Sequence, residues 1–293
     1  MSVRDIGIAL LVVMTWGVNF VALKWSVIEI PPFLLTGLRY LLAALPAVLI
    51  VPRPKMPLFL LLLYGTVIGT FQFGFLFVAI RLGLPAGLAS LLMQTQVFFT
   101  FGLAVWLLGE RPGVMQILGA TVAFAGIGVI ALERLAGATL LPLLLTLAAA
   151  FSFGASNIIT KKAGAIDMLS LVAWGSLVPP IPMFILSLLF EGPGALPDTI
   201  GHLTLRGGLS LLFSAYVITL VANKLWADLL GRYPANTVAP FTLLVPIFGI
   251  TSSMLLLHEP ISMFEVAGGA LVFLGLIINT FGPRLGARRM AKA

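Results

Sequence analysis

Uncharged polar side chains recur inside the apolar segments of this sequence, and their spacing limits the chemistry that they can do. Trp16 and Asn19 are three residues apart and Ser90 and Gln94 are four apart, so each pair shares one face of a helix. Amides, hydroxyls and indoles exchange hydrogen bonds without carrying a charge. This pattern favours binding of a small polar molecule, and we expect no catalytic residue and no enzymatic activity.

The candidate binding residues lie on five apolar segments. They are Trp16, Asn19, Gln72, Gln94, Asn157, Tyr216, Thr219 and Asn223. Polar groups are costly in hydrocarbon and usually face an interior or a cavity, so we expect this set to share a cavity. The alternative for any one of them is hydrogen bonding between helices. Gln96 lies about 200° around a helix from Gln94, so the two cannot both face one cavity, and of the two we favour Gln94.

A second group of residues suggests gating or structural roles. Arg39 lies about 10 Å inside its segment, at 1.5 Å per residue. We favour a structural role in which it pairs with Glu29 or a helix end, and the alternative is a substrate carboxylate. Prolines remove backbone hydrogen-bond donors and kink helices. A kinked helix beside a cavity can act as a gate, or the kink can be a static bend. The prolines concerned are Pro180, Pro182, Pro240 and Pro246.

Several chemistries lack their signature residues. The sequence has no cysteine, no phosphate-binding G-x-x-x-x-G-K-[ST] loop and no H-E-x-x-H zinc motif. We therefore expect no metal and no cofactor. No Asp or Glu falls near the middle of an apolar segment, where a proton-coupled carrier or a pump for lipophilic cations would keep one. No Lys or Arg falls at the centre, where a phosphate group would need it. A neutral or zwitterionic ligand remains.

The elements that position these residues follow from composition. The 293 residues are 60% hydrophobic and only 9% charged, whereas a soluble domain is roughly 25% charged. We therefore predict an all-α membrane protein with ten transmembrane helices, each of about 20 residues. The predicted segments are 5–28, 32–51, 57–80, 86–108, 112–132, 139–160, 168–190, 204–228, 234–257 and 262–281.

Lysine and arginine predict the orientation in the membrane. With a cytoplasmic N-terminus, one face carries Arg4, Arg53, Lys55, Arg111, Lys161, Lys162, Arg232, Arg284, Arg288, Arg289 and Lys292. The other face carries Arg81, Arg134 and Arg206. Because basic loops stay on the cytoplasmic side, both termini should be cytoplasmic. The same clustering explains the net charge of +7 without a nucleic-acid partner.

The chain repeats itself at an offset of 149 residues. LLGERPGVMQILGATVAFAGIGVI (107–130) is echoed by LLHEPISMFEVAGGALVFLGLIIN (256–279), and Gly17 and Lys24 are echoed by Gly154 and Lys161 at another offset. We predict two five-helix repeats, at 1–134 and 138–283, followed by a basic cytoplasmic tail at 284–293. Five is odd, so the second repeat must insert upside down, which places a site near the bilayer midplane.

Three motifs resemble the EamA-type branch of the drug/metabolite transporter superfamily. They are WGVNF in the first helix, Arg39 with Ala43 in the second, and GE-x-P before a Gly-rich helix that closes the repeat. Within that family the chain is most similar to bacterial amino-acid exporters, including those for aromatic amino acids. The resemblance implies a central cavity lined by the third, fourth, eighth and ninth helices. It also implies that the first and sixth helices move and that the fifth and tenth are peripheral. The first repeat's WG-x-N becomes FGASN (153–157) in the second.

These observations lead to one functional expectation and two alternatives. We expect a multi-pass transporter of the bacterial inner membrane that exports or facilitates neutral amino acids by alternating access, with aromatic ones among them. It would work as a monomer, with the small-molecule substrate and the lipid bilayer as its partners. The alternatives are a multidrug or sugar-phosphate type of carrier with the same fold, and a membrane binding protein without flux.

Overall fold

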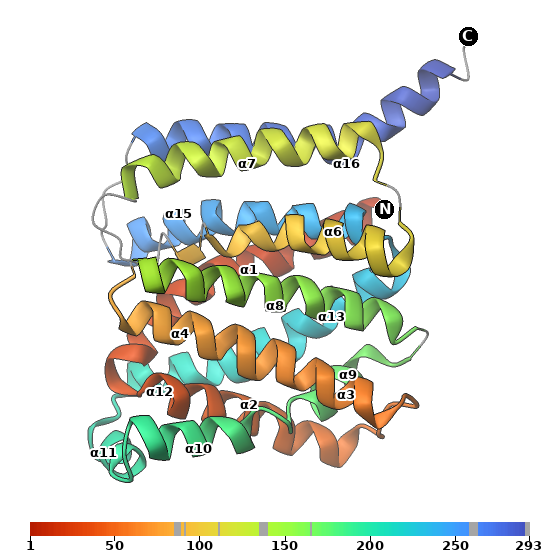
Figure 1. Ribbon diagram of the computed structural model, residues 1–293. Helices are drawn as coiled ribbons and strands as arrows, with labels where there is room; N and C mark the ends of the chain where they lie inside the picture. Colours follow the sequence, from red (N-terminus) through yellow and green to blue (C-terminus); the bar gives the residue numbers. More distant parts are fainter. Residues whose placement is uncertain are drawn as a thin grey trace.

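The computed structural model describes residues 1–84, 89–90, 92–110, 112–134, 140–164, 166–257 and 263–290. Over these residues the chain forms helices and no strand (Figure 1). In chain order they are α1 (Val3–Glu29), α2 (Pro32–Ile50), α3 (Leu58–Gly65), η1 (Thr66–Gln72), α4 (Phe73–Arg81), η2 (Met93–Thr95), α6 (Gln96–Leu108), α7 (Val114–Arg134), α8 (Leu140–Lys162), α9 (Met168–Gly175), α10 (Pro180–Phe190), α11 (Ala195–His202), α12 (Leu205–Leu212), η3 (Phe213–Ala222), α13 (Asn223–Arg232), α14 (Ala235–Val238), η4 (Ala239–Leu244), α15 (Val245–Leu257) and α16 (Met263–Met290).

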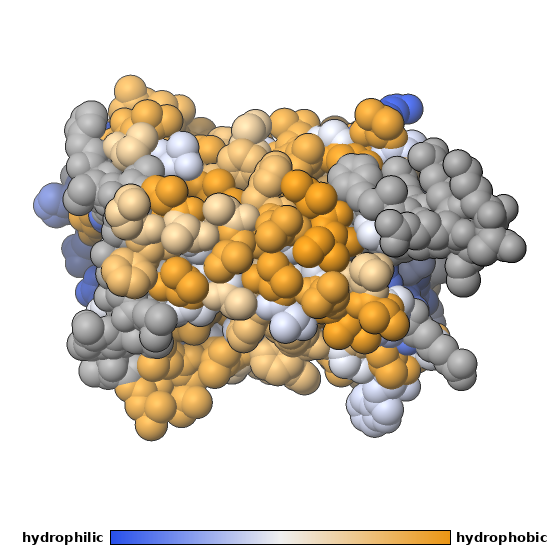
Figure 2. Space-filling view, turned by 90° about the horizontal axis from the view of Figure 1, so that it is seen from above, coloured by the Kyte–Doolittle hydropathy of each residue, from blue (hydrophilic) through white to orange (hydrophobic). Residues whose placement is uncertain are grey.

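Seven helical runs are long and apolar enough to cross a membrane. They are Val3–Glu29, Pro32–Ile50, Leu58–Arg81, Leu140–Lys162, Met168–Phe190, Leu205–Arg232 and Ala239–Leu256. Shorter apolar helices occupy Met93–Leu108, Val114–Gly126 and Val266–Gly275. The outer surface agrees with a lipid environment, because many large apolar side chains are exposed on it, Trp106 among them. Figure 2 shows this apolar surface between two ends where hydrophilic residues gather.

Four helical runs change their winding in the middle. The segments η1 and η3 are π-helical, and η2 and η4 are 3₁₀-helical. Adding 149 to the numbers of η1 gives 215–221, which falls inside η3. The same offset moves η2 to 242–244, which falls inside η4. The irregular windings therefore recur at the offset of the sequence repeat. Such departures from α-helix are frequent at functional sites.

Two of the four predicted prolines, Pro180 and Pro240, lie where the regular α-helix is interrupted. The run that contains Pro180 is interrupted between α9 and α10, and Pro180 is the first residue of α10. Pro240 lies in the first turn of the 3₁₀ segment η4, and Pro246 is the second residue of α15. Pro182 lies within α10, which continues past it to Phe190. The end of α3 and η1 pack closely against the residues just before Pro180, because a side chain at Gly65 would meet Val178 and one at Gly69 would meet Pro179.

Two glycines bring helices together in equivalent ways. A Cβ at Gly17 of α1 would lie 2.5 Å from Phe248 Cβ and 2.8 Å from Gly249 N. A Cβ at Gly154 of α8 would lie 2.9 Å from Phe99 Cβ and 3.0 Å from Thr100 N. Phe248 follows Phe99 by 149 residues, as Gly249 follows Thr100. The contact between α1 and α15 is therefore repeated between α8 and α6.

The helices α7 and α16 lie together at one edge of the bundle (Figure 1). Gly275 makes their close approach possible, because a side chain there would meet the backbone of Gly119 and Ala123. No described residue of α7 or α16 lines the central cavity, the smaller cavity beside it or the outer groove described below, in agreement with the peripheral place that the resemblance implied. The helix α1 begins, and α16 ends, at the same end of the bundle (Figure 1).

Candidate functional site

A cavity of about 70 Å³ lies among six of the predicted segments, the first, third, fourth, sixth, eighth and ninth. The polar side chains in its wall are Asn19, Gln72, Gln94, Asn223 and Thr242. The aromatic side chains in its wall are Trp16, Phe20, Phe73 and Phe153. None of the described residues that line it carries a charge. The wall can therefore offer hydrogen bonds and apolar rings to a ligand, in the manner of small-molecule pockets.

The structure brings five of the eight predicted binding residues to this cavity. They are Trp16, Asn19, Gln72, Gln94 and Asn223. Gln94, which we favoured, lines the cavity and Gln96 does not. Asn157 and Thr219 are buried beside the cavity rather than in its wall. Thr242, Phe20, Phe73 and Phe153, which were not among the predicted binding residues, also line the wall.

Tyr216 does not join the site. Its side chain is 38% exposed, whereas a spacing of i, i+3 and i+7 would put Tyr216, Thr219 and Asn223 on one face of a regular α-helix. That spacing assumed 3.6 residues per turn, but Tyr216 and Thr219 lie in the π-helical segment η3, whose hydrogen bonds run from i to i+5. The wider winding turns Tyr216 away from the face that carries Thr219, which is fully buried.

Asn157 is the centre of a hydrogen-bond network behind the cavity. Its Nδ2 donates to Gln96 Oε1 (3.2 Å) and to Thr100 Oγ1 (3.1 Å). Its Oδ1 accepts from Trp226 Nε1 at 3.0 Å. Gln96 in turn donates to Thr242, which lines the cavity. Asn157 therefore connects α8 with α6 and α13, which is the interhelical role that stood as the alternative for these residues.

Trp16 lies between the central cavity and a smaller one. Its ring centroid is 5.5 Å from that of Phe153 and 5.0 Å from that of Trp226. The second cavity, of about 10 Å³, shares Trp16, Phe153 and Asn223 with the first and extends to Tyr64. The aromatic cluster of Trp16, Phe153 and Trp226 therefore separates the two spaces.

Arg39 is fully buried and does not pair with Glu29 as we favoured. Its Nε donates to Thr219 Oγ1 at 2.8 Å, and its guanidinium carbon lies 4.1 Å from the centroid of the Phe73 ring. Glu29 instead accepts hydrogen bonds from the backbone N–H of Thr204 (2.8 Å) and from its hydroxyl (2.7 Å). A carboxylate at a helix N-terminus is stabilised by the exposed N–H groups and the helix dipole. The start of α12 thus takes the partner that we had expected for Arg39.

Other charged groups tie the ends of the bundle together. Glu191 accepts from the backbone N–H groups of Phe33 (2.7 Å) and Leu34 (3.0 Å), at the start of α2. At the end where α1 begins, Asp5 pairs with Arg232 at 2.8 Å. Carboxylates therefore cap helices and join α1 to α13 at the two ends, far from the uncharged wall of the central cavity.

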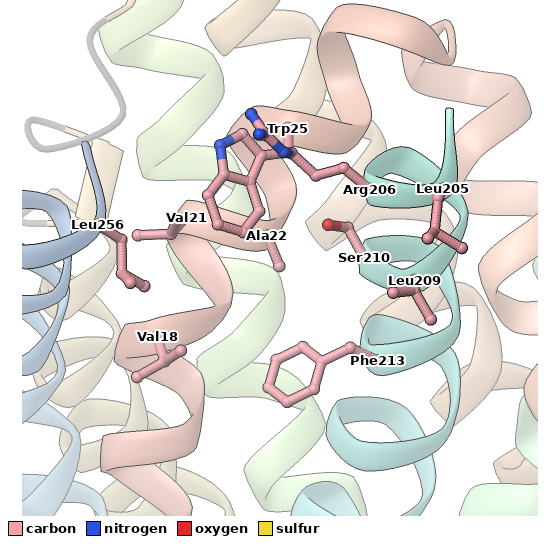
Figure 3. A pocket seen from close by; sticks show the side chains of 10 residues that line it. All are labelled: Val18, Val21, Ala22, Trp25, Leu205, Arg206, Leu209, Ser210, Phe213 and Leu256. Atoms are coloured by element: carbon pink, nitrogen blue, oxygen red, sulfur yellow. The ribbon is translucent and has the colours of Figure 1, made fainter. Parts of the chain in front are cut away.

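A wide groove of about 540 Å³ opens on the outside of the bundle between α1 and α12 (Figure 3). Val18 and Val21 of α1 face Leu209 and Phe213 across it, and Arg206 lies over the Trp25 ring at one end, 5.3 Å from its centroid. Inside the bundle, Ser214 donates to Asn19 at 2.8 Å and joins α1 to η3. The groove is almost entirely apolar, so it lacks the amide groups that make the central cavity a binding site.

The described residues contain no cluster of three or more His, Cys, Asp or Glu that could hold a metal ion. We therefore assign no metal ligands, and the chemistry of the central cavity rests on the side chains of its wall.

Comparison with known proteins places the chain in a family. Residues 5–132 and 140–281 each match the EamA-like transporter family. The chain is 44% identical over 290 residues to a "Probable amino-acid metabolite efflux pump" of Escherichia coli (strain K12), covering 97% of both proteins. A protein of the same description from Salmonella typhimurium is 44% identical and is covered to 99%. One solved crystal structure, 18% identical, aligns with a TM-score of 0.75 over 96% of this chain and 98% of its own.

The last comparison shows a shared fold, and the two family matches cover most of the chain. Together with the seven apolar helices, these matches identify a multi-pass protein of the bacterial inner membrane. The chain belongs to the EamA-like transporter family.

Proposed function

We propose that this protein moves neutral amino acids, including aromatic ones, out of the cell through the central cavity. The observation that carries this proposal is the composition of the cavity wall. Its amides and the Thr242 hydroxyl can hydrogen-bond the ammonium and carboxylate groups of an amino acid. Its four aromatic side chains can pack against an apolar or aromatic side chain of the substrate. Two relatives at 44% identity are described as probable amino-acid metabolite efflux pumps, which supports amino-acid metabolites as the substrate class and export as the direction.

The proposed mechanism is alternating access between two inverted repeats. We infer ten membrane spans, arranged as repeats over 1–134 and 138–283, with both termini and the basic tail at 284–293 in the cytoplasm. Three observations support this arrangement: the paired family matches, the recurrence of π and 3₁₀ segments at an offset of 149 residues, and the equivalent contacts of Gly17 and Gly154. Rocking of α1 against α15 and of α8 against α6 would open the cavity to one side of the membrane while closing it to the other. The candidate hinges are Pro180, Pro182, Pro240 and Pro246.

A cavity formed within one chain makes a monomer sufficient for transport. No described residue in its wall is a carboxylate or an imidazole, the groups that ordinarily change charge between about pH 4 and pH 7. The proposed export is therefore facilitated diffusion, whose flux follows the amino-acid gradient and is indifferent to a pH gradient.

Flux measurements in liposomes test this proposal. Labelled Phe, Trp, Met and Thr should cross membranes that contain the purified protein, whereas Glu and Lys should not. Asn223→Ala should reduce the flux. Tyr216→Phe is the control, because Tyr216 lies in the preceding segment η3 and its side chain is exposed, outside the cavity wall. Flux restricted to phosphorylated sugars, or a requirement for a proton gradient, would contradict the proposal.

A further inference from the structure

Arg39 is a buried cation with two unused hydrogen-bonding ends. Its side chain is fully buried, and Nε has Thr219 as its partner. Neither Nη1 nor Nη2 has a hydrogen-bond partner among the described residues. Leaving a buried charge uncompensated is strongly destabilising, and an ionisable side chain inside a membrane protein points to function. The missing partner is therefore an acceptor that the described part of the protein does not supply.

The guanidinium lies directly behind the wall of the central cavity. Phe73 lines that cavity and also covers the guanidinium at 4.1 Å. Thr219, which holds Nε, is next in sequence to Ile218, another residue of the wall. Arg39 thus reaches from α2 toward the cavity between the third and eighth segments, at their π-helical turns, with the Phe73 ring as its cover. A change in the Phe73 rotamer would bring Nη1 and Nη2 to the cavity.

Two unpaired acceptors belong to residues that line the same cavity. Gln72 Oε1 and Gln94 Oε1 are buried and have no hydrogen-bond partner in the described part of the chain, and both side chains line the wall. The unpaired atoms therefore comprise two donors on a cation and two neutral acceptors. An α-amino acid carries the complement, because its carboxylate accepts two parallel hydrogen bonds from a guanidinium and its ammonium donates up to three.

We propose that Arg39 binds the carboxylate of the transported amino acid, while Gln72 and Gln94 accept hydrogen bonds from its ammonium group. This assignment rests on the proposed function and adds to it a requirement for a free α-carboxylate. A phosphate group would also suit a guanidinium, but the two amide oxygens favour a ligand that carries a donor beside its anion. Phe73 would act as a cover that moves when the carboxylate enters.

Competition in reconstituted liposomes tests the assignment. Counterflow of labelled L-phenylalanine is measured in competition with unlabelled L-phenylalanine and with two analogues, L-phenylalaninamide and phenethylamine. Both analogues keep the ring and the amine but lack the carboxylate. In the wild type, the two analogues should compete about tenfold to a hundredfold more weakly than L-phenylalanine, as expected for a hydrogen-bonded charge. Arg39→Gln should weaken competition by phenylalanine to the level of its amide, and Arg39→Lys should keep part of the preference.

Arg206→Gln is the matched control, because Arg206 is exposed at the outer groove and should leave the preference unchanged. A folded Arg39→Gln protein that still prefers the carboxylate would overturn the assignment. If that variant does not fold, the wild-type comparison decides, since equal competition by phenylalanine and phenylalaninamide would also overturn it. Wild-type protein that exchanges sugar phosphates but no amino acid would contradict the proposed function as well.

Discussion

The indole nitrogen of Trp226 donates a hydrogen bond to the side-chain oxygen of Asn157 across 3.0 Å. Both side chains are buried, and Asn157 uses its amide nitrogen on Gln96 and Thr100. The donor and acceptor groups of Asn157 are thus all engaged with neighbouring helices. Asn157 therefore joins the helices around the cavity, and we expect the ligand to bind side chains whose polar atoms have no partner.

Asn157→Ala should therefore destabilise the protein. Removing one partner of a buried hydrogen bond costs about 1–3 kcal/mol, and Trp226, Gln96 and Thr100 would all lose one. We expect a clearly lower melting temperature in detergent. Ser156→Ala is the control, because the Ser156 hydroxyl donates only to Phe153 O of its own helix. Equal melting temperatures for the two variants would contradict the network.

Gln94 and Gln96 should respond differently to the same substitution. Gln94 lines the cavity with an unpaired oxygen, whereas Gln96 is bonded to Asn157 and Thr242. Gln94→Ala should raise the KM for transported phenylalanine with little change in stability. Gln96→Ala should lower stability by about 1–3 kcal/mol. The account is wrong if Gln94→Ala leaves transport unchanged.

Gly154→Ala should disturb the contact between α8 and α6. The added Cβ would lie 2.9 Å from Phe99 Cβ and 3.0 Å from Thr100 N, and overpacking of this kind costs about 1–3 kcal/mol. Gly102→Ala, also in this helix pair, meets nothing within 4 Å and should be neutral or slightly stabilising. Thermal unfolding of both variants, together with phenylalanine flux, checks this prediction.

Asp167 gives one expected dependence of stability on pH. It caps the start of α9, where the Ser170 hydroxyl donates to its Oδ2 at 2.6 Å and holds the pKa of the carboxyl below its usual value. A lowered pKa stabilises the fold above the usual pKa of about 4, and that contribution is lost as pH falls through the folded-state pKa.

Asp167→Ala should therefore cost about 1 kcal/mol at pH 7, as the loss of an N-cap. The difference in melting temperature between wild type and variant should shrink below about pH 4. Ser170→Ala should give a smaller version of the same effect. A difference that grows on acidification would reverse the sign and contradict the assignment.

Local patterns in the sequence predicted the seven long apolar helices and five of the residues that line the cavity. The lengths of the apolar runs predicted the helical segments, and Pro180 and Pro240 predicted two interruptions of the α-helix. Spacing along a regular helix brought Trp16 and Asn19 to one face. The failure at Tyr216 has a local cause that spacing cannot reveal, since the π-helical winding of η3 alters the periodicity.

Arg39 and Asn157 show the other limit of sequence reasoning. Whether a buried polar group is paired depends on residues far away in the chain, such as Thr219 for Arg39 and Trp226 for Asn157. Glu29 was a plausible partner for Arg39 by distance along the chain, but the start of α12 lies closer to it in space. Tertiary contacts decide which polar residues are free to meet a ligand.

Alternating exposure of the central cavity is tested most directly with a single introduced thiol. The natural chain has no cysteine, so Val245→Cys, in the cavity wall, and Val221→Cys, on the exposed face of η3, are the sole targets of a membrane-impermeant maleimide. The account predicts that Val245→Cys is labelled from either side of the membrane and is protected by L-phenylalanine, whereas Val221→Cys in the lipid stays unlabelled. Labelling of Val245→Cys from one side only, or without protection by phenylalanine, would contradict it.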